Sequence, residues 1–281
     1  MSFDELADLV RLHRHGLEED DEALLRKAYE LAEERHEGQE RRSKCPYFVH
    51  PYEVACLLAA MPMDVPTVCA GLLHDLVEDT ETTVDELGEL FGKDIARIVN
   101  GVTKLTLMGR KHIPRFEERQ AENYRQMVLG MTRDVRVIIV KLADRLHNMD
   151  TIEFMRPVQR RRIATETREI YAPLAARLGM HSVRNELDDL AFKTLDPDAY
   201  REIADMVHAK REQRERYKVE VITLLRQQLE KNGLKSVEVT GRSKHLHSIY
   251  QKIHVRGVPF DHIDDLIAFR VLVEVNADCY A

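Results

Sequence analysis

The ten residues GLLHDLVEDT, from Gly71 to Thr80, alternate apolar residues with side chains that can bind metals or transfer protons. On a helix, which turns by about 100° per residue, the polar side chains share one arc and the apolar ones the other. The polar arc holds His74, Asp75, Glu78 and Asp79, and the apolar side holds Leu72, Leu73, Leu76 and Val77. Gly71 falls within the polar arc and would leave space there for a ligand. The stretch predicts a helix that packs on a core and lines a polar cavity, with a solvated amphipathic helix as the alternative.

Two residues elsewhere in the chain are candidate partners for this polar face. His50, in YFVHPYEVACLLAA, directly precedes a proline that suits the first turn of a helix, which fixes the histidine at a helix mouth. Asp144 follows the apolar run VIIV, where a carboxylate is costly unless it is paired or binds a cation. Together with His74 and Asp75 they form a mixed nitrogen and oxygen site for a divalent ion. Mn²⁺ fits this donor set well, and Fe²⁺, Zn²⁺ and Mg²⁺ stay open.

The composition indicates a globular protein with room for one large or two ordinary domains. The chain has 281 residues, 44% of them hydrophobic, and its 49 acidic residues outnumber 42 basic ones, so bulk binding of nucleic acid is not expected. No apolar run reaches the roughly 20 residues of a membrane span, and the start lacks a signal-peptide core. We therefore expect a cytoplasmic location and no membrane partner. We also expect reduced thiols, because no CxxC pair occurs among the four cysteines, Cys45, Cys56, Cys69 and Cys279.

The spacing of apolar residues predicts a mainly α protein whose organisation changes near its end. Helical periodicity runs from Asp20 to about Leu195, and a second charged helical stretch, residues 198–233, stops at Asn232-Gly233. The segments SVEVTG and IAFRVLVEV then read as strands around a helix that starts near Lys244. We expect an all-helical domain over residues 1–196, followed over residues 197–281 by linking helices and the start of a small, incomplete α/β domain.

Several motifs, in order, resemble a known family over nearly the whole chain. The pattern His50, His74-Asp75, Asp144 is similar to that of the HD superfamily of metal-dependent phosphohydrolases. HEGQERRSKCPYFVHP, GLLHDLVEDT, VKLADRLHNM and EIYAPLAARLGM resemble the hydrolase domain of the Rel/SpoT family, which makes and destroys the alarmone (p)ppGpp. GRSKHLHSIYQKI and FDHIDDLIAFRVLV resemble the start of its synthetase domain.

The resemblance implies hydrolysis of the 3′-pyrophosphate of (p)ppGpp to GDP or GTP and pyrophosphate. It implies Mn²⁺ held by His50, His74, Asp75 and Asp144, with water handled by the acids Glu78 and Asp79. Arg41, Arg42 and Ser43 match a segment that contacts guanine, and Asn148 and Thr151 match residues of the nucleotide pocket. The basic pair Arg41-Arg42, with Lys141 as a weaker candidate, would balance the charge of the pyrophosphate.

In the second domain, the resemblance assigns ATP binding to Arg242, Lys244, Ser248 and Lys252, and Mg²⁺ binding to Asp265. We expect these basic residues to line one helix face. The family's catalytic glutamate and guanine-binding residues lie beyond the end of this chain, so we expect no pyrophosphate transfer here, although the parent protein would synthesise (p)ppGpp from ATP and GDP or GTP. The resemblance implies that the parent binds the ribosome, if at all, through C-terminal regions, with no nucleic acid expected on this part.

Alternatives for the function and for two further groups of residues stay open at this point. The chain could be an HD phosphohydrolase for another nucleotide, or an alarmone sensor without catalysis. His112 and His147 could bind a second metal, but a surface position or one beside the ligands fits their spacing better. The run Arg156 to Arg162 could meet phosphates or simply begin a solvated helix.

Overall fold

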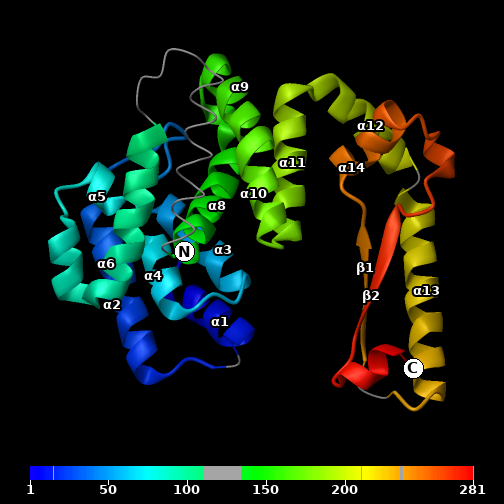
Figure 1. Cartoon of the computed structure of the whole chain (residues 1–281), viewed down its shortest axis with the longest axis horizontal. Helices are drawn as coiled ribbons and strands as arrows, with labels where there is room; N and C mark the ends of the chain where they lie inside the picture. The colour runs from blue at the N-terminus through cyan, green and yellow to red at the C-terminus, as the bar shows by residue number, and fades with distance from the viewer. Residues whose placement is uncertain (15, 110–133, 210, 235–236, 281) are drawn as a thin grey trace. The chain divides into compact units, whose positions relative to one another are not determined.

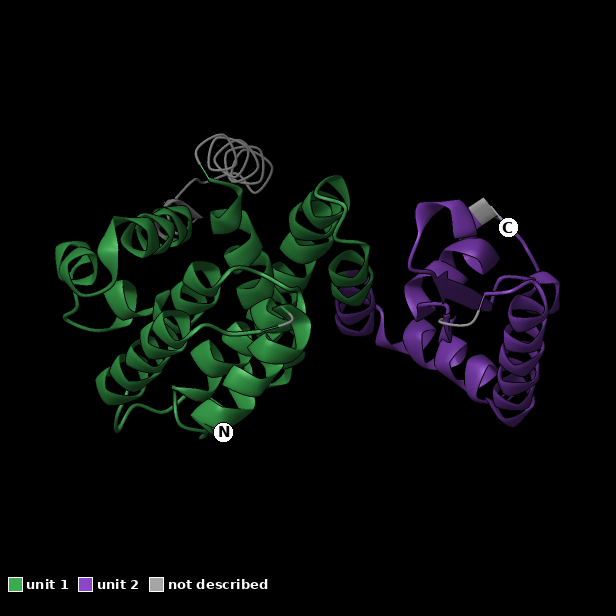
Figure 2. Cartoon of the chain, turned by 90° about the horizontal axis from the view of Figure 1, so that it is seen from below, with its two compact units in different colours: residues 1–187 green, residues 188–281 purple. Residues whose placement is uncertain are grey.

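The computed structural model describes residues 1–14, 16–109, 134–209, 211–234 and 237–280. The chain forms two compact units, residues 1–187 and residues 188–281 (Figure 2). The first unit is helical, and the second combines helices with a two-stranded sheet, which confirms the predicted mainly α fold with a small α/β part. The compact units divide within one helix, and the boundary expected after residue 196 stays a prediction.

The described residues of the first unit are mainly helical. In chain order the helices are α1 (Phe3–Arg14), α2 (Glu19–Arg35), α3 (Val49–Ala60), α4 (Val65–Leu73), α5 (Leu76–Asp79), α6 (Val84–Gly109), α8 (Val135–Asp150), η1 (Ile152–Phe154), α9 (Pro157–Glu166), η2 (Thr167–Tyr171), α10 (Ala172–Arg177) and α11 (His181–Leu195), which continues into the second unit. Helix α1 lies before Asp20, outside the region over which the spacing of apolar residues predicts helices. It buries Phe3, Leu6, Ala7 and Val10, a spacing that places all four on one helix face.

Helix α4 lies at the centre of the first unit (Figure 1). Every residue of α4 except Pro66 is buried, and the helix packs against α2, α3, α6 and α8. Asp64 caps its start by accepting a hydrogen bond from the Thr67 backbone N–H at 3.2 Å. Helix α8 packs in turn against α3, α4 and α6. This packing brings together segments that lie far apart in the sequence.

The stretch predicted as one helix, Gly71 to Thr80, is divided between α4 and α5. His74 and Asp75 form a turn between the two helices, although their backbone angles stay close to helical values. The apolar side is confirmed, because Leu72, Leu73 and Leu76 are fully buried.

The expectation that Gly71 opens space for a ligand is wrong. A Cβ at Gly71 would lie 2.5 Å from Leu58 Cδ1 and 3.5 Å from Ala55 Cα, both on α3. The glycine therefore lets α4 approach α3 closely, which is a packing role.

The second unit pairs two strands along a long helix. Its elements are α12 (Pro197–Ala209), α13 (Arg211–Lys231), β1 (Glu238–Ser243), α14 (Leu246–Tyr250), η3 (Gln251–Val255), η4 (Phe260–His262), β2 (Ile267–Leu272) and η5 (Asn276–Tyr280). The helical stretch expected over residues 198–233 is thus two helices. The strands are antiparallel, with Glu238 opposite Leu272, and α13 packs along both (Figure 1). The predicted stop at Gly233 is confirmed, because this residue has a φ of 88° just after α13.

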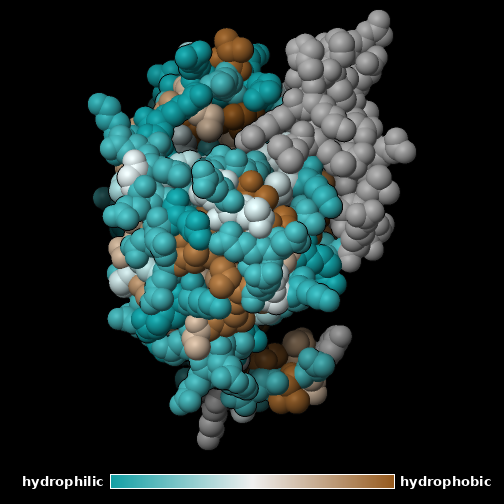
Figure 3. All heavy atoms as spheres, turned by 90° about the vertical axis from the view of Figure 1, so that its left-hand side faces the viewer, coloured by the Kyte–Doolittle hydropathy of each residue, from teal (hydrophilic) through white to brown (hydrophobic). Residues whose placement is uncertain are grey.

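The surface is mostly polar, because the helices are amphipathic and have charged outer faces. The face of the molecule in Figure 3 is mostly hydrophilic, and hydrophobic residues show there only as small patches among polar side chains. Of the helices that the structure describes, none has both the length and the apolar character that crossing a bilayer would require.

Candidate metal centre and adjoining cavity

His74 is held at the junction of α4 and α5 with one ring nitrogen free of hydrogen bonds. The side chain is 1% exposed, and its Nδ1 lies 2.7 Å from the Gly71 carbonyl oxygen. Because a carbonyl only accepts, Nδ1 donates, and in the neutral ring this leaves the lone pair on Nε2. Nε2 is buried without a hydrogen-bond partner, yet it lies 3.1 Å from Asp75 Oδ1. Two acceptors this close in a buried place favour a cation between them.

His50 brings a second imidazole to the same point from the first turn of α3. It is 2% exposed, and its Nε2 lies 3.6 Å from Asp75 Oδ2. The rings of His50 and His74 have their centroids 5.2 Å apart. One ligand atom from each of His50, His74 and Asp75 can be chosen so that all three lie within 4.8 Å of one another. The described residues therefore include a candidate site for a divalent metal ion.

Asp144, the fourth predicted ligand, lies beside this group, on α8. Its Oδ1 is 3.2 Å from His50 Nε2, and its Oδ2 accepts from Lys141 Nζ at 2.5 Å. Asn148 Nδ2 also donates to Oδ1. Burial raises the pKa of Asp144, but Lys141 and His50 outweigh burial and place the pKa well below its usual range. Lys141 is bonded to Asp144 and to Thr106 Oγ1, at 3.0 Å, so the structure gives this lysine a partner inside the site.

Tyr47 links the site to Asp79 and was missed in the sequence. Its hydroxyl lies 2.5 Å from Asp79 Oδ2 and 3.1 Å from Asp75 Oδ2, so one hydrogen is shared between two carboxylates. Burial first, and then the charge of Asp75, raise the pKa of Tyr47, which keeps the hydroxyl a donor. Its ring stacks on His36, with centroids 4.7 Å apart. The position of Tyr47, three residues before His50, is the signal that could have singled it out.

The other acid of the pair, Glu78, lies on the short helix α5 with Asp79. Glu78 is half-buried and Asp79 is exposed. Both acids are held close to the His74-Asp75 turn. The backbone N–H groups of Glu78 and Asp79 donate to the Asp75 carbonyl at 3.0 and 2.9 Å. The geometry of the turn therefore ties the two acids to the candidate metal centre.

His147 is buried beside His50. Its Nδ1 lies 2.7 Å from His50 Nδ1 and 3.4 Å from the Arg41 Nη1. Burial, together with the nearby His50 and Arg41, lowers the pKa of His147 to about 3. The structure therefore places His147 next to a predicted ligand, which is one of the positions expected for it from the sequence. His112 lies outside the described residues.

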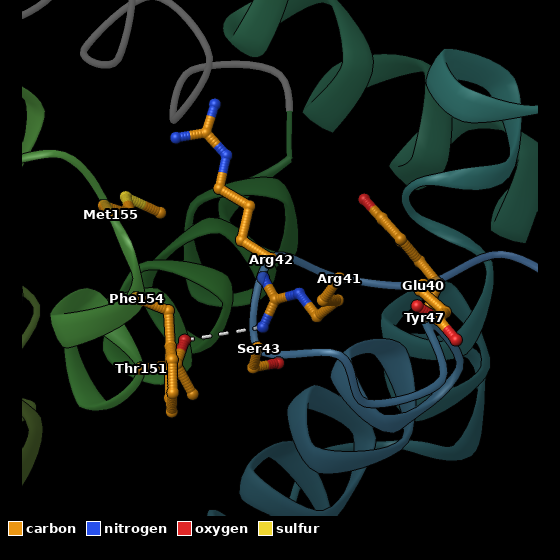
Figure 4. A pocket seen from close by; sticks show the side chains of 8 residues that line it. All are labelled: Glu40, Arg41, Arg42, Ser43, Tyr47, Thr151, Phe154 and Met155. Carbon is orange, nitrogen blue, oxygen red and sulfur yellow. Dashed lines mark hydrogen bonds between the residues drawn. The ribbon is translucent and has the colours of Figure 1, made fainter.

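A cavity of about 250 Å³ lies in the first unit and contains most of the predicted substrate contacts (Figure 4). Its lining residues are Glu40, Arg41, Arg42, Ser43, Tyr47, Thr151, Phe154 and Met155. Arg41, Arg42, Ser43 and Thr151 were predicted from the sequence, whereas the other four were not. Tyr47 belongs both to this cavity and to the hydrogen bonds of Asp75 and Asp79, so the cavity adjoins the candidate metal centre.

The arginines of the cavity are fixed by neutral partners. Arg41 donates to Asn148 Oδ1 at 2.8 Å and to Thr151 Oγ1 at 3.4 Å, the contact drawn in Figure 4. Arg42 donates to Gln159 Oε1 at 2.7 Å. Because Asn148 also donates to Asp144, it joins Arg41 to Asp144. Because these hydrogen bonds to described residues end on uncharged groups, they do not themselves neutralise either guanidinium.

The loop that carries the arginines is closed by backbone hydrogen bonds. The Arg41 N–H donates to the Cys45 carbonyl at 2.9 Å, and the Lys44 N–H donates to the Arg41 carbonyl at 2.9 Å. Glu40 and Pro46 form an isolated β-bridge across its base. Lys44 has a φ of 63°, a conformation that favours glycine.

The predicted ATP-binding residues of the second unit do not share a helix face, so that expectation is wrong. Arg242 lies on β1, Ser248 on α14 and Lys252 on η3, because β1 extends to Ser243 and α14 begins only at Leu246. The structure does bring Lys244 and Lys252 together on the predicted Mg²⁺ ligand. Their Nζ atoms lie 2.5 and 2.7 Å from the two carboxylate oxygens of Asp265.

Comparison with known proteins places these features in a family. Residues 28–181, more than half of the chain, match the HD domain family, and residues 241–281 match a region found in RelA and SpoT proteins. The chain is 45% identical over 257 residues to a GTP pyrophosphokinase of Myxococcus xanthus, covering 92% of this chain and 34% of that protein. It is 44% identical over 278 residues to the bifunctional (p)ppGpp synthase/hydrolase SpoT of Escherichia coli K12, covering 99% of this chain and 39% of SpoT.

A solved structure of a metazoan ortholog of SpoT, which hydrolyzes ppGpp and plays a role in starvation responses, shows a distant likeness. Its TM-score is 0.40 at 20% identity, over 67% of this chain and 96% of that one. The chain spans between a third and two fifths of the length of the two curated relatives described above. With the HD domain match over residues 28–181, the chain belongs to the HD domain family, and its residues 241–281 match a region found in RelA and SpoT proteins.

Proposed function

We propose that this chain hydrolyses the 3′-pyrophosphate of (p)ppGpp, giving GDP or GTP and pyrophosphate, with the help of a divalent metal ion. The observation that carries the proposal is the unpartnered, buried Nε2 of His74, which meets His50 and Asp75 next to an arginine-lined cavity. The names of relatives support the substrate, since one that is 44% identical over 278 residues is a guanosine-3′,5′-bis(diphosphate) 3′-pyrophosphohydrolase of Escherichia coli O157:H7.

His50, His74, Asp75 and Asp144 would hold the ion. Two imidazole nitrogens and two carboxylates suit a borderline divalent metal, and we propose Mn²⁺ ahead of Fe²⁺, Zn²⁺ and Mg²⁺. The His74 ring is already oriented by its hydrogen bond to the Gly71 carbonyl, which leaves Nε2 as the ligand atom. Asp144 would join the set from its position beside His50.

When bound, the metal ion would act as a Lewis acid and make the attacking water more acidic. Glu78 and Asp79 would orient that water and take its proton, with Asp79 held in place by the Tyr47 hydroxyl. Water adds to the phosphorus that carries the ribose 3′ oxygen, and the bond between them breaks. The 3′ oxygen takes up a proton and leaves as the nucleotide hydroxyl, while the added oxygen stays on pyrophosphate.

The cavity supplies the positive charge that a phosphate-rich substrate needs. Arg41 and Arg42 are held by neutral acceptors, and Glu40 is the one acid among the eight lining residues. A guanidinium group can stack on a purine or bind an oxyanion through two hydrogen bonds, so either arginine could contact the base or a phosphate. Ser43 and Thr151 add hydroxyl groups for polar contacts with the nucleotide.

A single assay tests the proposal. The chain mixed with ppGpp and Mn²⁺ should release GDP and pyrophosphate, and Asp79→Asn should lower the rate about 10²- to 10⁴-fold while Mn²⁺ binding stays intact. Tight binding of ppGpp to the metal-loaded chain without product would instead indicate a sensor. Faster hydrolysis of another nucleotide in a substrate panel would indicate a different HD phosphohydrolase.

The RelA/SpoT region favours a second activity for the whole protein, namely transfer of pyrophosphate from ATP to GDP or GTP. Arg242, Lys244, Ser248 and Lys252 would bind ATP, and Asp265 would bind Mg²⁺. The family match supports this, as does the GTP pyrophosphokinase name of one relative. The expected lack of transfer by this chain, the cytoplasmic location, and ribosome binding through other regions all stay predictions.

A further inference from the structure

We infer that His147 is a positioning residue that accepts a hydrogen bond from His50 and thereby connects the arginine-lined cavity with the metal centre. This inference rests on the proposed function, because it assumes that His50 binds the metal ion. His147 was not among the residues assigned to the site, and it lies on α8 between Asp144 and Thr151. Its side chain is 9% exposed, so its ring nitrogens depend on protein partners.

The distance between the two histidines requires one shared proton. His50 Nδ1 and His147 Nδ1 lie 2.7 Å apart, with ring centroids 4.8 Å apart. At this distance one nitrogen must donate and the other must accept. The opposite nitrogen of His50, Nε2, faces Asp75 and Asp144 and is the atom that would bind the metal. A metal-binding nitrogen carries no proton, so the proton of His50 has to be on Nδ1.

Arg41 leads to the same assignment independently. Its Nη1 lies 3.4 Å from His147 Nδ1, a long but favourable contact, and a guanidinium group can only donate. His147 Nδ1 must therefore carry a lone pair, and its proton is on Nε2. Because that nitrogen has only one lone pair, the short contact of 2.7 Å is the hydrogen bond from His50, and Arg41 at 3.4 Å makes the weaker contact with it.

The consequence is that His147 fixes the tautomer and the ring orientation of a metal ligand from outside the ligand set. Partners of this kind typically change metal affinity about 10- to 100-fold when they are removed. The same acceptor is contacted by Arg41, which lines the substrate cavity. His147 Nδ1 therefore contacts both Arg41, a residue of the substrate cavity, and His50, a predicted metal ligand.

Two variants of matched shape test the role. In His147→Asn the side-chain oxygen can take the place of Nδ1 as an acceptor, whereas His147→Leu has a similar branched shape and no acceptor. We expect His147→Leu to weaken Mn²⁺ binding about 10- to 100-fold and His147→Asn to stay within about threefold of the unaltered chain. Titration calorimetry with Mn²⁺ alone gives the affinities, and thermal unfolding without metal shows whether each variant folds.

Equal Mn²⁺ affinity of the unaltered chain and His147→Leu would overturn the inference, and so would an equal loss in both variants. If the unaltered chain does not bind Mn²⁺ at all, the proposed metal centre fails together with this inference. Failure of the inference alone is recognised because the unaltered chain then still binds Mn²⁺. Nitrogen NMR of the unaltered chain provides a check that needs no variant. A proton on His147 Nδ1 would overturn the inference, and a proton on Nε2 is the expected result.

Discussion

The carboxylates of Asp144 in the first unit and Asp265 in the second unit are both paired with lysine, yet their surroundings differ. The Asp144 side chain is 6% exposed, and its oxygens are contacted by Lys141, Asn148 and His50. The Asp265 side chain is 51% exposed and is contacted by Lys244 and Lys252. The first acid is enclosed by packed helices, and the second lies just before a strand of a two-stranded sheet.

The difference shows what burial does to an ion pair. A buried charge without a partner costs several kcal/mol, so each group around Asp144 depends on the others. An exposed pair gains little, because water solvates either partner alone and salt screens the attraction. The same residue types therefore form an interdependent site in the first unit and a loosely held cluster in the second.

The largest expected effect is that of Asp144→Ala. It should lower the free energy of unfolding by about 3 kcal/mol or more, because it leaves the buried ammonium group of Lys141 without its ion-pair partner. Asp265→Ala should cost at most about 1 kcal/mol, because that acid is exposed. Urea unfolding of the two variants compares the sites directly. Asp144→Ala should also abolish hydrolysis of ppGpp, with Asp198→Ala, an exposed acid of α12, as the matched control. Equal costs for Asp144→Ala and Asp265→Ala would break the comparison.

A smaller effect is expected for Tyr47→Phe. The variant keeps the ring stacked on His36 but loses the hydrogen bond to Asp79, so we expect kcat for ppGpp to fall about tenfold, the equivalent of one hydrogen bond. The hydroxyl also donates to Asp75, a predicted metal ligand, so saturating Mn²⁺ is needed to keep any loss of metal affinity out of kcat. The measurement is steady-state kinetics at saturating Mn²⁺, with Tyr217→Phe, an exposed tyrosine of α13, as the control. An unchanged kcat would show that the Tyr47 hydroxyl does not position Asp79 for the reaction.

The smallest effect concerns the pH dependence of the exposed cluster. Hydrogen bonds from Lys244 and Lys252 lower the pKa of Asp265 to about 2. Because the folded pKa lies below the ordinary value of 3.8, the stabilisation is complete above pH 3.8 and is lost as the pH falls through about 2. Carbon NMR titration should show this pKa, and Lys252→Ala should raise it, while Lys231→Ala should not. A wild-type pKa near 3.8 would mean that the lysines do not hold the carboxylate in solution.

Much of the candidate site could be predicted from the sequence. The alternation in GLLHDLVEDT identified which side chains are buried and which are polar, since helical spacing is a local property. His50 before a proline and Asp144 after VIIV were also local signals, because a buried polar residue needs a partner. The family resemblance supplied Arg41, Arg42, Ser43 and Thr151, all of which line the cavity.

Other features could not be predicted, because they depend on packing between distant segments. Gly71 was expected to open space for a ligand, but it makes room for Leu58 of a neighbouring helix. The expected single face of Arg242, Lys244, Ser248 and Lys252 failed because a strand and a turn separate these residues.

The sequence by itself determined the residue types, the helical periodicity and the order of the motifs, because these follow from local geometry and composition. Only the tertiary structure decided that Tyr47 shares its hydrogen between Asp75 and Asp79 and that His147 contacts both His50 and Arg41. Such contacts join α3, α5, α8 and the arginine-bearing loop, and their distances depend on how the helices pack. Hydrogen bonds act over about 3 Å, so a small difference in packing decides which partners meet.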